Sequence, residues 1–292
     1  MNWSDPRAIL WTAILLYGAA LVLGMARTAK GREEMGAGAL WSFLLVLAGF
    51  LAQTKGLHMR GLEVRGCPLG NGMERIQFIL WSVVLGYLIV RVFFRLNLLG
   101  SFSAGLACLG GAASLLLPGL DTAYWKEPSY DRLFADHWIE LHASVAIFSY
   151  GVFALLAVVS VMYLLQQRAL RDKRSGRLAP FLPSIRRLEL GSARLLLVGV
   201  AFLSVSIAVG ALHWSGNPEN VASLKLGVTV LLWMAYTVLW FLHFRQLLYG
   251  RKFAQACIVL FIVAILSLGF LRSRNDSPQG SPPVSPEQKS VR

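Results

Sequence analysis

Long runs of apolar residues alternate with short polar segments along most of the chain. A membrane-spanning helix needs roughly 20 mostly apolar residues, because about 1.5 Å of rise per residue must cross about 30 Å of hydrocarbon. Eight runs meet this requirement, at about 8–26, 38–57, 76–94, 98–117, 139–165, 194–213, 224–244 and 253–271. The pattern therefore predicts an all-α fold, a polytopic membrane helix bundle of about eight transmembrane helices.

The same pattern predicts the domain organisation. Residues 1–272 form one integral membrane domain, and residues 273–292 are polar and rich in Pro and Ser, which is typical of a disordered tail. The first run is long for the apolar region of a signal peptide, and Asp5 beside Arg7 stands where a signal peptide has a basic cluster. We expect this run to be a retained helix.

Composition supports the membrane interpretation. Hydrophobic residues make up 56% of the chain and charged residues only 15%. A soluble domain is usually about one quarter charged. This balance excludes a disordered chain, a secreted disulfide scaffold and an ordinary cytosolic enzyme.

Most of the basic residues behind the net charge of +13 lie in the loops between the expected spans. Of the 28 Lys and Arg residues, 16 lie in the odd-numbered loops and seven in the even-numbered ones. Cytoplasmic loops carry the excess of Lys and Arg, so we expect both termini outside a bacterial-type cytoplasmic (inner) membrane. The long basic loop at Gln166–Arg194 then faces the anionic inner leaflet. Membrane lipids, and not nucleic acid, are the expected partner of this charge.

Ionisable residues are scarce in the expected spans. No Asp, Lys or Arg lies deep in any of them, and Glu140 stands at a membrane edge. Pumps and proton-coupled transporters keep such residues inside the membrane, so the pattern disfavours a transporter. Gln53, Gln77 and Gln255 are interpreted as helix-packing or interfacial groups.

The five histidines are the remaining candidates for binding a metal or a cofactor. Four of them fall at the predicted outer ends of spans, namely His58, His137, His142 and His213, whereas His243 falls at an inner end. Imidazole binds zinc and haem iron, and the chain has no H-E-x-x-H zinc motif. Aromatic residues near the outer rim, including Trp214 and Trp233, could form a haem surface. An aromatic belt of interfacial residues and hydrogen-bonded histidines would produce the same pattern, so both interpretations stay open.

An ordered series of motifs resembles the cytochrome c assembly protein family, in its divergent HemX-like or YpjD-like branch. The series begins with Gly66-Cys-Pro68-Leu-Gly-Asn71-Gly-Met-Glu74, followed by Phe78 and Trp81. It continues with His142, Ser149-Tyr150, Leu188-Glu189-Leu190, Gly199, Gly210, Lys225, Trp233, Tyr236, His243-Phe-Arg245 and Gly250-Arg251-Lys252. The resemblance covers roughly residues 10–270. Independently of it, Asn71 and Glu74 have the spacing of a helix capping box.

The resemblance implies haem handling at the outer membrane face before haem is attached to apocytochrome c. By position, His142 resembles the outer haem-ligating histidine, and His243 resembles a histidine within the membrane part of haem-exporting members. The segment from Trp214 to Lys225 takes the place of the family's tryptophan-rich cradle. A membrane partner subunit and apocytochrome c are the implied partners. The resemblance thus implies an assembly factor, as a component of a haem-lyase or haem-export complex, more than a stand-alone enzyme.

This sequence also departs from the family pattern. The segment reads WSGNPENVASLK, with one tryptophan where the family has several, and no histidine follows His243. We expect His213 to replace the missing second ligand, since it ends the sixth span on the side of His142. The alternatives are a membrane scaffold or regulator of haem biosynthesis without transfer chemistry, and an unrelated transporter or packing subunit.

Overall fold

The computed structural model describes residues 5–29, 37–94, 97–121, 137–171, 183–214 and 223–273. Within these ranges the chain is helical apart from short turns. The helices are α1 (Pro6–Ala29), α2 (Ala37–Val64), α3 (Gly72–Phe94), α4 (Asn97–Leu116), α6 (His137–Arg171), α7 (Ile185–Trp214), α8 (Ser223–Phe244) and α9 (Gly250–Ser273). All eight are long and apolar enough to cross a membrane, which confirms the expected class of a multi-pass helix bundle.

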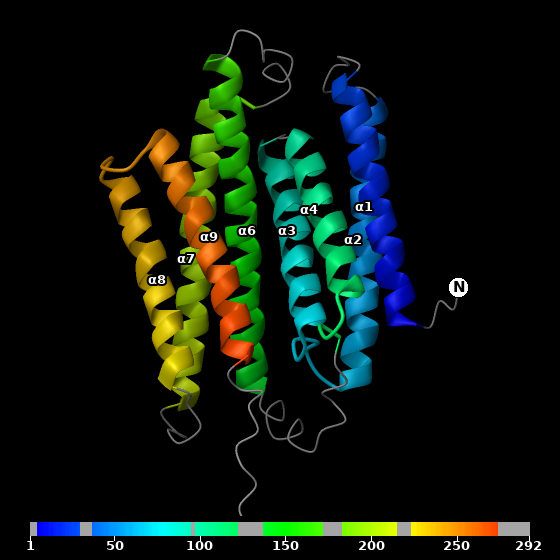
Figure 1. Ribbon diagram of the computed structural model, residues 1–292, viewed down its shortest axis with the longest axis vertical. Coiled ribbons are helices and arrows are strands. Elements are labelled where there is room, and N and C mark those ends of the chain that lie inside the picture. The colour runs from blue at the N-terminus through cyan, green and yellow to red at the C-terminus, as the bar shows by residue number, and fades with distance from the viewer. Residues whose placement is uncertain are drawn as a thin grey trace, which may run out of the picture.

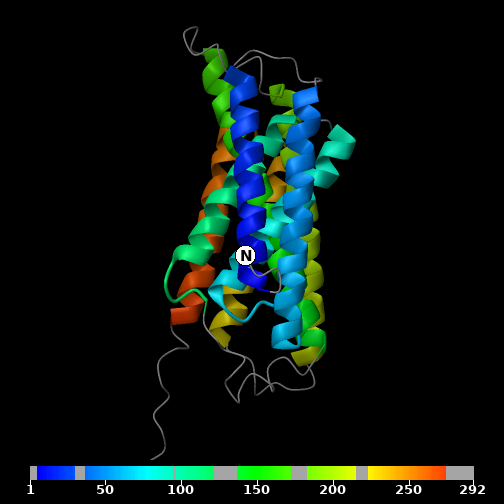
Figure 2. The same cartoon turned by 90° about the vertical axis from the view of Figure 1, so that its right-hand side faces the viewer.

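The helices run up and down along one axis in two groups of four (Figures 1 and 2). One group holds α1 to α4, the other holds α6 to α9, and the main contact between the groups is made by α3 and α6. α1 begins and α9 ends at the same end of the bundle (Figure 1). An even number of consecutive spans places the start of the first and the end of the last on the same side of a membrane.

α6 is the most buried of the spans and forms the centre of the core. Phe153, Leu155 and Leu156 on this helix are fully buried. Gly151 lets α6 approach α3, because a side chain there would collide with Ser82. Small residues at such contacts allow membrane helices to pack closely where no hydrophobic drive acts between them.

A chain of buried hydrogen bonds ties α1 to α4 together. The Tyr17 hydroxyl donates to Gln53 Oε1 at 2.8 Å, and Gln53 Nε2 donates to Gln77 Oε1 at 2.9 Å. Gln77 Nε2 then donates to Ser114 Oγ at 2.9 Å. Each of these polar groups would be costly to bury alone, and together they satisfy one another. The helix-packing interpretation of the two glutamines is confirmed.

Several helices extend beyond the apolar runs from which they were predicted. α6 continues to Arg171 and α7 begins at Ile185, so most of the basic loop expected at Gln166–Arg194 is helix and only residues 172–184 connect the two. Arg and Lys are good helix formers, so the backbone hydrogen bonds continue past the end of the apolar run. Residues 274–292, where the tail is predicted, lie outside the described part of the chain.

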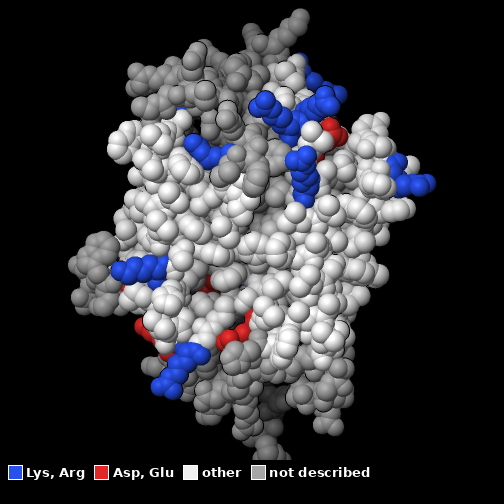
Figure 3. Space-filling view, turned by 180° about the vertical axis from the view of Figure 1, so that it is seen from behind, with Lys and Arg blue, Asp and Glu red and all other residues white. Residues whose placement is uncertain are grey.

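Charge is distributed as the topology predicts. Figure 3 shows more Lys and Arg toward one end of the bundle, with a few acidic groups at both ends and a largely uncharged surface between them. The basic end is the one where α1 and α6 finish and where α2 and α7 begin. The described surface therefore matches a bilayer-spanning bundle with one strongly basic face.

Candidate functional site

His142 lies just over one turn inside α6, at the end of the bundle where α7 finishes. Its Nδ1 lies 2.7 Å from the carbonyl oxygen of Ser206 on α7. The Ser206 hydroxyl donates to the carbonyl of His142 at 3.0 Å and lies 3.1 Å from Nδ1. A carbonyl can only accept, so Nδ1 carries the proton and the lone pair of the neutral ring is on Nε2. This bond fixes both the orientation and the tautomer of the imidazole.

Trp233 is fixed to the same stretch of α7 from the other side. Its indole Nε1 donates to Ser204 Oγ on α7 at 2.8 Å, and Ser204 Oγ in turn donates to the carbonyl of Val200 at 2.8 Å. Ser204 and Ser206 are two residues apart on one helix, so they face in different directions. α7 thus holds His142 of α6 and Trp233 of α8 at nearly the same level of the bundle.

His213 and Trp214 form the end of α7, seven and eight residues after Ser206. A rise of about 1.5 Å per residue puts them about two turns closer to the end of the bundle than the His142 contact. Their side chains lie outside what the structure describes, as does the His137 side chain. The pairing of His213 with His142 therefore stays a prediction.

His243 lies at the opposite end of the bundle, in the last turn of α8. Its Nδ1 hydrogen-bonds the carbonyl of Leu248 at 3.1 Å, and its ring stacks on Phe253 of α9 with the ring centres 4.1 Å apart. These contacts close the turn between α8 and α9. The bundle thus separates His243 from His142, as the sequence predicts.

The face of α6 that points away from α7 is held by the loop between α2 and α3. Glu140 Oε1 accepts a hydrogen bond from the backbone N–H of Cys67 at 3.0 Å. One turn later, the Ser144 hydroxyl lies 3.3 Å from the Cys67 sulfur. Burial raises the pKa of the Cys67 thiol, the negative charges of Glu140 and Glu74 raise it further, and the hydrogen bond from Ser144 lowers it. The loop therefore contacts the helix turn that carries His142.

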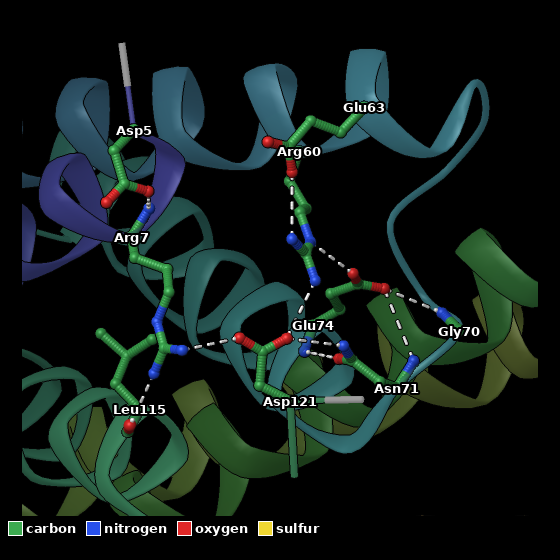
Figure 4. A network of polar contacts seen from close by, with 9 residues as sticks. All are labelled: Asp5, Arg7, Arg60, Glu63, Gly70, Asn71, Glu74, Leu115 and Asp121. Atoms are coloured by element: carbon green, nitrogen blue, oxygen red, sulfur yellow. Dashed lines mark hydrogen bonds and ion pairs between the residues drawn. The ribbon is translucent and has the colours of Figure 1, made fainter. Parts of the chain in front are cut away.

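A network of ion pairs centred on the buried Arg60 and Glu74 anchors this loop (Figure 4). Arg60, at the end of α2, donates to Glu74 at 2.8 Å, to Asp121 at 2.9 Å and to Glu63 at 3.0 Å. Arg7 of α1 reaches the second oxygen of Asp121 at 3.1 Å. Two cations thus meet three carboxylates where α1, α2, α3 and the segment after α4 converge.

The expected capping box is present in this network. The side-chain oxygen of Asn71 accepts from the backbone N–H of Glu74 at 2.8 Å, and Glu74 Oε2 accepts from the backbone N–H groups of Gly70 at 3.0 Å and Asn71 at 3.5 Å. Glu74 is fully buried and Arg60 is 7% exposed. α2 and α3 extend beyond their expected apolar runs, and the added turns carry Arg60 and Glu74 as an ion pair at the end of the bundle.

Sequence reasoning missed the residues that orient the candidate ligands. Ser204 and Ser206 are ordinary small polar residues of an apolar helix, and nothing in their spacing indicates which neighbour they bind. Arg60 was counted among the loop charges because it follows an apolar run. Within the described ranges, no three His, Cys, Asp or Glu side chains cluster as metal ligands.

Comparisons with known proteins add a family and several relatives. A model described as cytochrome C assembly protein matches residues 69–275. Protein HemX of Brevibacillus brevis is 30% identical over 143 residues, which cover 49% of this chain and 51% of that protein, or about half the length of this relative. Protein HemX of Bacillus subtilis is 22% identical over 210 residues, covering 70% and 74%. Cytochrome c biogenesis protein CcsA of Parasynechococcus marenigrum is 26% identical over 261 residues, covering 77% and 81%.

Proposed function

Since this chain belongs to the cytochrome c assembly protein family, we propose that it assists cytochrome c biogenesis by binding haem at the outer face of the membrane. The observation that carries this proposal is the bond between His142 Nδ1 and the Ser206 carbonyl at 2.7 Å. Histidines that ligate metals almost always donate their other ring N–H to such an acceptor, which orients the ring and makes the ligating nitrogen more basic. Through Nε2, His142 would hold the haem iron.

Trp233 supports the proposal by its level in the bundle, since its bond to Ser204 fixes it on α7 near the height of the Ser206 contact to His142. His213 is the proposed second ligand, and Trp214, the next residue in the sequence, is proposed to take part in the site. When bound, haem supplies the iron that these imidazoles ligate. The residues of the chain orient haem and limit its contact with water until it is passed on.

His243 is proposed to serve a second, inner haem site. It lies at the other end of a bundle that spans about 30 Å of hydrocarbon, so one haem cannot bind both His243 and His142. Its Nδ1 also contacts a carbonyl, that of Leu248, which favours the same tautomer as in His142. The His243 ring would lose its stacking contact with Phe253 if it rotated toward a ligand.

The orientation and the partners complete the proposal. The excess of Lys and Arg in the odd-numbered loops favours a cytoplasmic basic face, hence outer termini in the cytoplasmic membrane. We propose that the chain works as an assembly factor with a membrane partner subunit that completes the haem path, and with apocytochrome c as the acceptor. Lipids, and not nucleic acid, face its basic end.

Spectra of the detergent-purified protein, oxidised and reduced, test the outer site. His142→Ala should remove most of the Soret absorption per protein after haem is added, whereas His58→Ala and His137→Ala should change it little. In His142→Gly, added imidazole should restore the band, because free imidazole can replace the missing ligand. Equal haem content in all variants would refute the role of His142, and a colourless wild-type protein would refute haem binding altogether.

A membrane scaffold or regulator of haem biosynthesis is the second candidate function. The single tryptophan in WSGNPENVASLK favours it, since transfer chemistry would use a richer aromatic cradle. In cells that depend on this gene, its deletion would then change haem precursor levels while cytochrome c maturation continues when haem is supplied. Loss of cytochrome c under haem supply favours the assembly role.

A further inference from the structure

A groove of about 570 Å³ runs along the surface between α2 and α3, apart from the histidine site. Its α2 side is a stripe of residues at helical spacing, namely Thr54, His58, Gly61, Leu62 and Arg65. Its α3 side is aromatic and consists of Phe78 and Trp81. The stripe extends over about 16 Å of helix, from well inside the span to its end.

The aromatic side of the groove is rigid. Trp81 donates its indole N–H to Thr54 Oγ at 2.8 Å, so its polar atom is satisfied within the protein. Phe50 stacks on the same ring with the centres 5.5 Å apart, and Phe78 lies 5.4 Å away. The ring surfaces are therefore held in place along the apolar part of the groove.

The other end of the groove is basic and strained. Arg65 is exposed there, and His58, also exposed, lies two turns earlier on α2. Arg65 has a φ of 55° and ends α2 in the left-handed conformation, with the N–H of Gly66 bonded to the carbonyl of Gly61 at 3.1 Å. Glycine normally takes this position because a side chain is disfavoured in it. Here the strained position carries a guanidinium at the mouth of the groove.

Charge complementarity at this mouth favours an anion. The nearby carboxylates of Glu63 and Glu74 are bound by Arg60. Within the part of the chain that the structure describes, no acidic side chain pairs with Arg65. The groove thus combines a cationic end at the membrane surface with an aromatic channel that enters the hydrocarbon.

We propose that this groove binds one anionic phospholipid. The phosphate contacts Arg65 and His58, and one acyl chain lies along Leu57 and the rings of Phe78 and Trp81. Basic residues near the membrane surface each attract anionic lipid headgroups by about 1 kcal/mol, roughly a fivefold change in affinity. The bound lipid covers the join between α2 and the loop that contacts α6.

Native mass spectrometry of the detergent-purified full chain tests this site. The probes are phosphatidylglycerol and phosphatidylcholine with identical acyl chains. We expect one phosphatidylglycerol to be retained in preference to phosphatidylcholine, and Arg65→Gly to raise the concentration for half occupancy about fivefold. Arg251→Gln, which removes an exposed arginine at the other end of the bundle, is the control and should change nothing.

Arg65→Gly also separates binding from folding. Glycine relieves the left-handed conformation, so this variant should unfold at the same or a higher temperature while it binds the lipid more weakly. Phosphatidylglycerol with brominated acyl chains should quench tryptophan fluorescence in the wild type. Trp81→Phe should remove the contribution of Trp81 to this quenching. Equal retention of both lipids, unchanged binding by Arg65→Gly, or displacement of the lipid by stoichiometric haem would overturn the proposal.

Discussion

At Arg60, one guanidinium binds the carboxylates of Glu63, Glu74 and Asp121 at a membrane end of the bundle. Glu74 is fully buried, so its charge depends on this partner and on the backbone donors of the loop. A buried ion that loses its partner keeps the cost of desolvation and loses the attraction. Arg60 therefore matters more to stability than an exposed arginine.

Arg60→Met should lower the free energy of unfolding by about 3–5 kcal/mol, because it leaves the buried Glu74 carboxylate without this guanidinium. Thermal unfolding in detergent measures the effect. The double variant Arg60→Met with Glu74→Met should recover much of the loss, since no lone charge then remains. Arg251→Met, at an exposed position, should stay within about 0.5 kcal/mol of the wild type. A loss no larger for Arg60→Met than for Arg251→Met would contradict the argument.

His243→Ala tests whether the inner histidine takes part in a haem path. We expect less haem at His142 in cells, with normal protein level and topology, and recovery of the outer spectrum when haem is added from outside. Removing the Leu248 hydrogen bond should also cost about 1 kcal/mol of stability. Unchanged haem content and unchanged cytochrome c maturation would leave His243 as the residue that closes the α8–α9 turn.

At the scale of elements, the loop between α2 and α3 is the join that reaches α6. It ends α2 at Arg65, begins α3 with the Asn71–Glu74 capping box, and contacts α6 through Cys67. Its backbone groups are thus bound to side chains of α3 and α6 and to a backbone carbonyl of α2. These bonds tie the loop to the helix that carries His142.

Alkylation of Cys67 reports on this loop through its pH dependence. The raised pKa means that the folded protein favours the neutral thiol, so any stabilisation from it is present below the unfolded pKa and is lost as pH rises through the folded pKa. In a variant with Cys108 and Cys257 replaced by Ser, the labelling rate should rise at a higher pH than for a free thiol, near 8.5. Glu140→Gln should shift the profile to lower pH, whereas an unshifted profile would exclude Glu140 as a cause.

The sequence predicts these elements unequally. Each span was predicted because apolar length alone decides whether a helix can cross a bilayer. The capping box was predicted because Asn71 and Glu74 are three positions apart, so each side chain can accept a hydrogen bond from the other residue's backbone N–H. The Ser206 contact to His142 and the Arg60 network were not, because each joins residues that only the packing of several helices brings together.

For the whole molecule, even and odd connections lie at opposite ends of the bundle (Figure 1). The four-plus-four arrangement keeps His142 and the α2–α3 loop at the end where α1 begins and α9 finishes, and His243 at the other. Which end faces the cytoplasm remains a prediction from the distribution of Lys and Arg.

Reporter fusions after Arg174 and after Asn217 test this orientation. The first should report the cytoplasm, because it follows the most basic connection of the chain, and the second should report the exterior. A cytoplasmic reporter that is inactive outside and a periplasmic reporter that is inactive inside give opposite readings for each site. Reversed readings would show that the protein has the opposite orientation in the membrane. Equal readings for the two fusions would contradict the number of spans between them.

The close approach of α3 and α6 at Ser82 and Gly151 sets an order of events during synthesis. These residues are about 70 positions apart, and a ribosome adds roughly 5–20 residues per second. Ser82 is therefore made about 3–14 s before Gly151, so its side of the contact faces lipid until α6 arrives. Formation of the α3–α6 contact joins the two groups of helices into one bundle. The same step brings Glu140 of α6 to the backbone of Cys67 in the α2–α3 loop.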